Sequence, residues 1–127
     1  MEASSSPSQF ESLGHAGRQN YAGLETFPNP GVERVEMTSD ELAALCPITL
    51  QPDMYVATIE YFPRALCLES KSVKLYLMQF RNEGQFCEAL TVRIRDDVAA
   101  ALELAADRVH VTLRQKSRGG IVIVSSV

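Results

Sequence analysis

The sequence predicts an α+β fold in which two β-hairpins flank a pair of helices, in the order ββααββ. Residues 54–62 and 109–114 alternate in side-chain character and are rich in β-branched and aromatic residues, as strands are. Between them, residues 86–102 repeat apolar side chains every four positions, which is a helical pattern. We expect an antiparallel sheet with both helices on one face, and open sheet edges that join copies into a ring.

The N-terminal part of the chain is predicted to be a flexible tail. Residues 1–23 are rich in Ser, Gly and Gln and contain few apolar side chains. Turn-forming residues at 28–31 are followed by a short alternating stretch, Val32, Val35 and Met37, which is predicted to be the first strand. The single domain is therefore expected to span residues 24–127.

Residues 38–53 are predicted to be a constrained loop. Ser39 or Asp40 can cap one short helical turn through Leu45, and Pro47 and Pro52 make a longer helix costly. The strand at 54–62 follows this loop and stops before Pro63.

Residues 68–81 fit two patterns. Val73, Leu75 and Leu77 alternate as in a strand, but Val73, Leu77 and Phe80 also lie on one helix face. The length of the segment and its lack of breakers favour a helix.

The second helix begins after Gly84 and carries the clearest helical signal. Phe86 and Leu90 are expected to start its inward apolar stripe. A turn at 117–120 then joins the strand at 109–114 to the last strand, 121–124.

Composition and charge exclude several classes of function. A chain of 127 residues has room for one domain, and a net charge of -4 disfavours nucleic acid as a partner. No apolar stretch is long enough for a membrane span, and the first residues do not resemble a leader. The odd count of three cysteines predicts reduced thiols in the cytoplasm, and the two distant histidines give no metal-ligand pattern.

Cys46 and Asp53 are the first candidate chemical pair. A thiolate adds to electrophilic carbon, and a carboxyl group can protonate the atom that becomes negative. The alternative is that Cys46 merely ends the apolar run 42–45 as a small buried residue. Cys67 lies in an apolar segment and is expected to be a packing residue.

Polar groups at the two predicted helix starts form the other candidates. Ser70, Lys71, Ser72 and Lys74 offer hydroxyl, N–H and ammonium groups to a phosphate-bearing ligand, and the alternative is an ordinary capped helix. Glu88 at the second helix start can accept N–H donors from a base-like ring, or can simply complement the helix dipole.

Five segments in this order and spacing resemble the short form of the QueF nitrile reductases. They are ETFPNP (25–30), CPITLQPD (46–53), ESKSVKLY (69–76), QFRNEGQFCE (79–88) and RGGI (118–121). The resemblance covers residues 24–124 and implies the tunnelling fold, or T-fold, in agreement with the ββααββ order. It implies reduction of 7-cyano-7-deazaguanine to 7-aminomethyl-7-deazaguanine by two NADPH, on the route to the tRNA base queuosine.

The resemblance also implies roles for single residues. Cys46 would attack the nitrile carbon to give a thioimide, and Asp53 would protonate the nitrile nitrogen. The implied substrate site comprises Glu88, Cys87, Glu69 and Ser70, and the implied NADPH site comprises Ser70, Lys71, Ser72, Lys74 and Arg118. Sites of this fold lie between subunits, so a homo-oligomer is expected.

Two residues depart from the family pattern. Leu50 replaces a glycine, which is expected to reshape the loop beside the nucleophile. Cys87 replaces a histidine, and a thiol is a weaker hydrogen-bond donor, so slower proton delivery is expected.

These departures keep two other functions open. One is an amidinotransferase-like enzyme, in which an amine attacks the thioimide, although such relatives resemble the ESKSVKLY segment poorly. The other is a ring-forming protein that binds a deazapurine or pterin without turnover.

We predict a reversible disulfide between Cys46 and Cys87 under oxidation, because the resemblance brings both thiols to one site. A count of free thiols before and after treatment with peroxide tests this hypothesis. An unchanged count would contradict it.

Overall fold

A computed structural model describes residues 23–127, so the predicted tail at 1–23 lies outside the described residues except for Gly23. Four long strands form one antiparallel sheet in the order β2-β3-β5-β6, and a second, two-stranded sheet pairs β1 with β4. The strands are β1 (Thr26–Pro28), β2 (Val35–Leu45), β3 (Pro52–Tyr61), β4 (Leu66–Leu68), β5 (Val109–Arg118) and β6 (Ile121–Ser126). The helices are α1 (Ser70–Met78) and α2 (Cys87–Leu102), with short 3-10 turns at Gln79–Asn82 and Ala106–Arg108.

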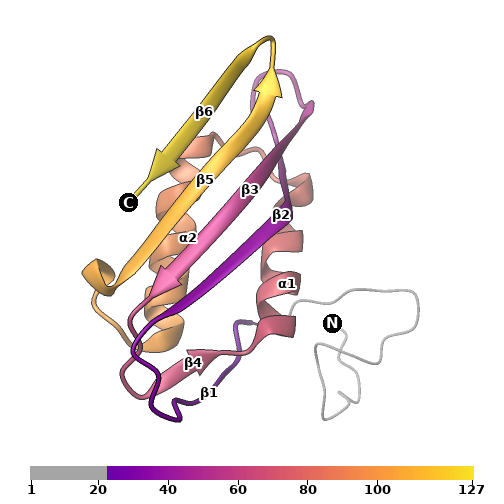
Figure 1. The fold of residues 1–127 in the computed structure, drawn as a ribbon. Coiled ribbons are helices and arrows are strands. Elements are labelled where there is room, and N and C mark those ends of the chain that lie inside the picture. Colours follow the sequence, from indigo (N-terminus) through magenta and orange to yellow (C-terminus); the bar gives the residue numbers. More distant parts are fainter. Residues whose placement is uncertain (1–22) are drawn as a thin grey trace, which may run out of the picture.

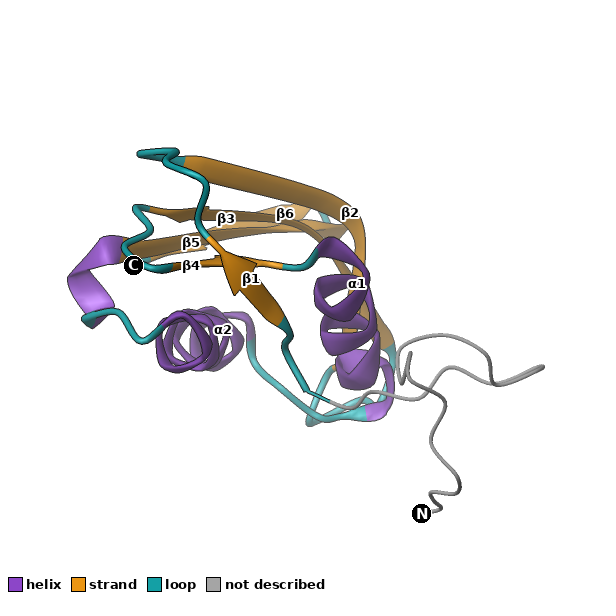
Figure 2. Cartoon of the chain, turned by 90° about the horizontal axis from the view of Figure 1, so that it is seen from below, coloured by secondary structure: helices purple, strands orange, loops and turns teal. Residues whose placement is uncertain are grey.

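Both helices pack on the same face of the four-stranded sheet (Figures 1 and 2). The predicted α+β class and the ββααββ order of the main elements are confirmed, and β1 and β4 are additions that the sequence did not predict. None of the helices within residues 23–127 is long and apolar enough to cross a membrane.

The core lies between the sheet and the helices. Every second residue of β3 and β5 faces the helices, so Tyr55, Ile59, Val111 and Leu113 are fully or almost fully buried. From the helix side, Leu90, Ile94, Val98 and Leu102 of α2 meet them at a spacing of four. We call this helix-covered side of the sheet the inner face.

The prediction of a loop with a helical turn at 38–45 is wrong, because these residues continue β2. They pair with β3, and burial of the alternating Leu42 and Ala44 stabilises the strand. A register shift between Ser39 and Leu42 hides the alternation in the sequence, since a β-bulge adds one residue and reverses which side chains face inward.

The predicted inward position of Phe86 is also wrong. Phe86 is the N-cap residue of α2, and its side chain is 55% exposed. Cys87, the next residue, is buried instead. The apolar stripe of α2 therefore begins with Cys87 and Leu90.

Candidate active site

The bulge in β2 sets the direction in which Cys46 points. Before the bulge Ser39 shares the inner face with its partner Ala57, and after it Ala44 shares that face with Asp53. Cys46 follows two residues later, and its residue surface is only 8% exposed. The irregular strand thus carries the cysteine to the same face and the same end of the sheet as the carboxyl group of Asp53.

The turn after Cys46 is closed by two backbone hydrogen bonds. Cys46 N–H donates to Gln51 O over 2.8 Å, and Leu50 N–H donates to Cys46 O over 2.9 Å. Leu50 has a φ of 60°, in the left-handed region that glycine adopts most easily. Leu50, which the resemblance predicts to stand in place of a glycine, therefore holds a glycine-type backbone conformation at a cost of roughly 1–2 kcal/mol, with its side chain exposed.

A second bulge brings Arg118 to this turn. The register between β5 and β6 shifts between Gln115 and Arg118, which turns the Arg118 side chain toward Asp53. Arg118 Nη1 lies 3.2 Å from Asp53 Oδ1 and donates a hydrogen bond of 3.4 Å to Gln51 Oε1. Gly119 and Gly120, both with positive φ, close the tight hairpin turn that follows.

The surroundings of Cys46 favour the thiolate. Hydrogen bonds from the Thr49 side chain and backbone, then from Arg118 and from the Ile48 backbone, lower the pKa of Cys46 to about 6. Cys46 is therefore mostly ionised at neutral pH. Arg118 contacts both Cys46 and Asp53, so its guanidinium group joins the two predicted catalytic residues.

The start of α2 is joined to the same turn through Leu45. Leu45 N–H donates to Glu83 O over 2.8 Å, and Gln85 N–H donates to Leu45 O over 3.0 Å. This bridge places Cys87 and Glu88 near Cys46 and Asp53. Cys87 is buried, and burial raises the pKa of its thiol, whereas Glu88 is exposed in the first turn of α2.

The first turn of α1 is closed by side chains of the chain itself. The Glu69 carboxylate caps the helix by accepting hydrogen bonds of 2.7 Å from the Lys71 and Ser72 N–H groups. Ser72 is buried, and its hydroxyl donates to Glu69 O and accepts from Glu25 N–H. Ser72 and Glu69 therefore stabilise the chain, while Ser70 and Lys74 stay exposed to a ligand.

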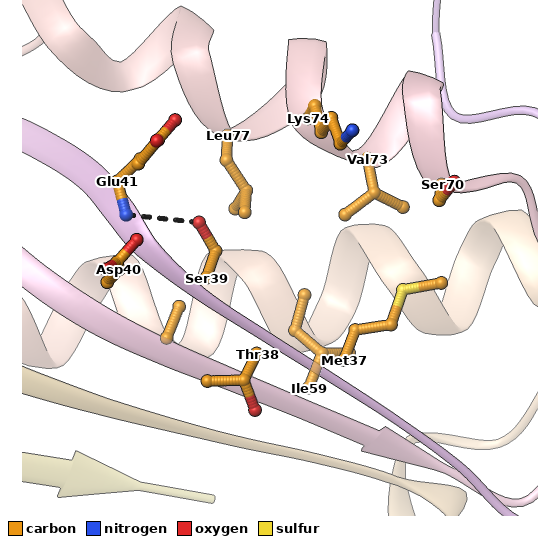
Figure 3. Close-up of a pocket in the computed structure, with 11 residues that line it drawn as sticks. Met37, Thr38, Ser39, Asp40, Glu41, Ile59, Ser70, Val73, Lys74 and Leu77 are labelled. Carbon is orange, nitrogen blue, oxygen red and sulfur yellow. Dashed lines mark hydrogen bonds between the residues drawn. The ribbon is translucent and has the colours of Figure 1, made fainter.

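A groove of about 510 Å³ lies between α1 and the β2 edge of the inner face (Figure 3). Ala57, Ile59, Val73 and Leu77 give it an apolar floor. Polar side chains also line it, among them Ser39, Asp40, Glu41, Ser70 and Lys74, and Lys71 lines a smaller adjoining cavity. The β2 bulge contributes Asp40 and Glu41 to the groove, which is thus mixed in charge.

The predicted site residues therefore form two clusters. The cysteine cluster, at the end of the sheet where β2 turns into β3, comprises Cys46, Asp53, Cys87, Glu88 and Arg118. The groove cluster, on the first turns of α1, comprises Glu69, Ser70, Lys71, Ser72 and Lys74, and α1 begins near the opposite end of the sheet (Figure 1). Arg118, predicted with the NADPH residues, lies in the cysteine cluster.

The sequence pointed to neither Thr49, which lowers the pKa of Cys46, nor Tyr55, whose buried hydroxyl lies near the cysteine cluster. Thr49 belongs to an exposed turn, and the alternating pattern of its strand predicts Tyr55 only as an ordinary core residue, so neither stood out in the sequence. No group of three or more potential metal ligands occurs in the described part of the chain.

Comparisons with known proteins identify the family of this chain. The model of the family described as "QueF-like protein" matches residues 52–127. The chain belongs to the QueF-like family.

Two relatives illustrate the extent of the similarity within the QueF-like family. The chain is 46% identical over 101 residues to the NADPH-dependent 7-cyano-7-deazaguanine reductase of Nitrosospira multiformis, covering 77% of this chain and 71% of that protein. It is 42% identical over 115 residues to the reductase of the same name from Frankia casuarinae, covering 90% of each.

A solved structure confirms the predicted T-fold. The crystal structure of the archaeosine synthase QueF-Like in the apo form matches with a TM-score of 0.68 and 22% identity, over 76% of this chain and 93% of that chain. At this identity the likeness establishes the fold.

We predict that the rate of Cys46 alkylation by iodoacetamide rises with pH around a midpoint of about 6, because the thiolate is the reacting form. Thr49→Val removes the largest contribution to the lowered pKa and should move the midpoint upward. Thr58→Val, on the far face of the sheet, should leave it unchanged. Cys46→Ala identifies the signal, and a wild-type midpoint above 8 would contradict the assignment.

Proposed function

We propose that this chain is an NADPH-dependent 7-cyano-7-deazaguanine reductase that acts in queuosine biosynthesis. The observation that carries the proposal is the contact of Arg118 with both Cys46 and Asp53, in a QueF-like chain whose relatives bear that name. The two other functions predicted from the sequence, an amidinotransferase and a binding protein without turnover, are not favoured by these relatives.

In the proposed first step, the Cys46 thiolate forms a bond to the nitrile carbon and one π bond of the nitrile breaks toward nitrogen. The nitrogen takes a proton from Asp53, which for this step carries the proton released by the Cys46 thiol. Thiol and nitrile together thus give a neutral thioimide, and Asp53 is left as the carboxylate that pairs with Arg118. Arg118 supports this step because its guanidinium group stabilises the thiolate and holds the buried Asp53 carboxyl group beside it.

Glu88 is proposed to bind the deazaguanine edge. Its carboxylate is exposed in the first turn of α2, where it can accept paired N–H donors from the base. Because the Leu45 bridge joins the start of α2 to the Cys46 turn, a base held by Glu88 can direct its nitrile toward Cys46.

NADPH, when bound, supplies the hydride for each of the two reduction steps. The groove fits part of a dinucleotide, since it combines an apolar floor with the ammonium groups of Lys71 and Lys74. Asp40 and Glu41 offset these charges within one chain. We propose that Ser70, Lys71 and Lys74 bind the cofactor. Ser72, with its hydroxyl already engaged, supports the helix turn that carries them.

We propose that the active enzyme is a homo-oligomer in which each site combines two copies. The cysteine cluster lies where β2 turns into β3, whereas the groove cluster lies on the first turns of α1, which begins near the opposite end of the sheet. This separation supports a site that takes one cluster from each of two chains. Apolar side chains that a partner would cover lie exposed around the cysteine cluster: Ile48, Leu50, Phe86 and Ile121. The apolar edge strand β6 offers unpaired backbone groups for the same purpose.

We infer a cytoplasmic enzyme that acts on a free deazapurine rather than on nucleic acid. Three cysteines without a disulfide suit a reducing compartment, and the net charge of -4 disfavours a polynucleotide substrate.

The first test combines the purified chain with 7-cyano-7-deazaguanine, before and after addition of NADPH. Intact mass should show a covalent adduct, and NADPH absorbance should then fall by two equivalents per substrate. Cys46→Ala should abolish both, because it removes the nucleophile. An adduct without NADPH oxidation would favour an amine acceptor, and the absence of both would refute the proposed reaction.

The shared site is tested by mixing two inactive variants, Cys46→Ala and the double variant Lys71→Ala/Lys74→Ala. If sites combine two copies, co-assembly should restore activity, with roughly a quarter of the sites intact after random mixing. Sites within one chain would give no recovery. Each variant incubated alone is the control.

A further inference from the structure

Two buried side-chain oxygen atoms lack a hydrogen-bond partner among the described residues, and both lie at the cysteine cluster. They are Asp53 Oδ1 and Tyr55 Oη. The Arg118 contact with Asp53 Oδ1 is an ion pair at 3.2 Å without hydrogen-bond alignment. A buried polar atom without a partner costs roughly 1–3 kcal/mol, so a pair of them at one site points to a ligand that satisfies both.

Tyr55 reaches this site from the middle of the sheet. It is two residues after Asp53 on the inner face of β3, opposite Leu42 and Gln115, and its exposed fraction is 0%. The charges that act on its hydroxyl are those of Cys87, Asp53, Glu88 and Cys46. The hydroxyl therefore lies among the residues of the cysteine cluster.

Tyr61, also in β3, is a tyrosine whose hydroxyl has a structural role. It is also on the inner face and fully buried, but its hydroxyl accepts a hydrogen bond of 2.9 Å from Leu68 N–H. Tyr61 thereby fixes β4 to β3. The Tyr55 hydroxyl makes no such bond within the described chain. Packing of the ring would be satisfied equally by a phenylalanine, so it does not explain the hydroxyl at this position.

We propose that Tyr55 is a catalytic residue whose hydroxyl donates a hydrogen bond to the nitrogen of the substrate's nitrile as Cys46 adds to the carbon. This inference rests on the proposed function. The thioimide nitrogen has one N–H and one lone pair, which match an acceptor at Asp53 Oδ1 and a donor at Tyr55 Oη. The two unpartnered atoms are complementary to the group that the reaction creates.

The chemistry of the neighbouring groups makes Tyr55 the suitable donor. Burial raises the pKa of Tyr55 above its ordinary value, so the hydroxyl keeps its proton throughout the working pH range. The buried Cys87 thiol is a weak donor. A preorganised donor aimed at developing negative charge stabilises the transition state more than the ground state.

The test compares Tyr55→Phe with Tyr61→Phe in the full chain, with the wild type measured in parallel. Tyr55→Phe should slow thioimide formation by about 10²-fold, as loss of one such donor does elsewhere. Its melting temperature without substrate should stay the same or rise, and the pH midpoint of Cys46 alkylation should not move. Tyr61→Phe should melt at lower temperature, because Leu68 N–H loses its acceptor, but should form the adduct at the wild-type rate per folded molecule.

Each outcome decides between these assignments. A Tyr55→Phe variant that forms the adduct within twofold of the wild-type rate would overturn the role of Tyr55 and leave the proposed function intact. A lower melting temperature with an unchanged rate per folded molecule would make the hydroxyl structural. A wild-type chain that forms no adduct would overturn the proposed function and this inference together.

Discussion

The two-residue alternation of the antiparallel sheet is the constraint on which the site depends. Successive side chains of a strand face the helices and the open side of the sheet in turn. An extra residue in a bulge reverses this assignment, so each side chain after the bulge faces the opposite side from the one it would otherwise face. The bulges in β2 and β5 make this reversal just before the chain reaches Cys46 and Arg118. Asp53 needs no such device, because β3 keeps its alternation throughout.

Electrostatics then link the residues that the sheet has brought together. Arg118 serves two partners, since it lowers the pKa of Cys46 and forms an ion pair with Asp53. A tight turn with a strained Leu50 directs Thr49 and Ile48 toward the same sulfur. Backbone strain at a functional turn persists only where surrounding contacts hold it, and here the paired strands β2 and β3 supply them.

The separation of the two clusters is a physical reason for the proposed assembly of several copies of this chain. One chain has a reactive thiol at the end of the sheet where β2 turns into β3, and a lysine-bearing groove between α1 and the middle of β2 and β3. The groove is mixed in charge, and the cysteine end leaves large apolar side chains exposed. In the proposed homo-oligomer, contact between copies would bury the exposed apolar surface and bring the two clusters together.

Periodicity predicted α2 and the strands β3 and β5, because burial on one face imposes a regular spacing on the sequence. The prediction of α1 also needed the length of the segment and its lack of breakers, and that of β6 needed the turn at 117–120. The motif resemblance selected Cys46, Asp53, Glu88 and the lysines of α1. Residues 38–45 were mistaken for a loop, since a bulge interrupts the alternation and long-range pairing with β3 outweighs local helix signals. The place of Arg118 beside Cys46 and the unpartnered hydroxyl of Tyr55 followed only from the folded chain, because strand register and side-chain contacts depend on residues distant in sequence.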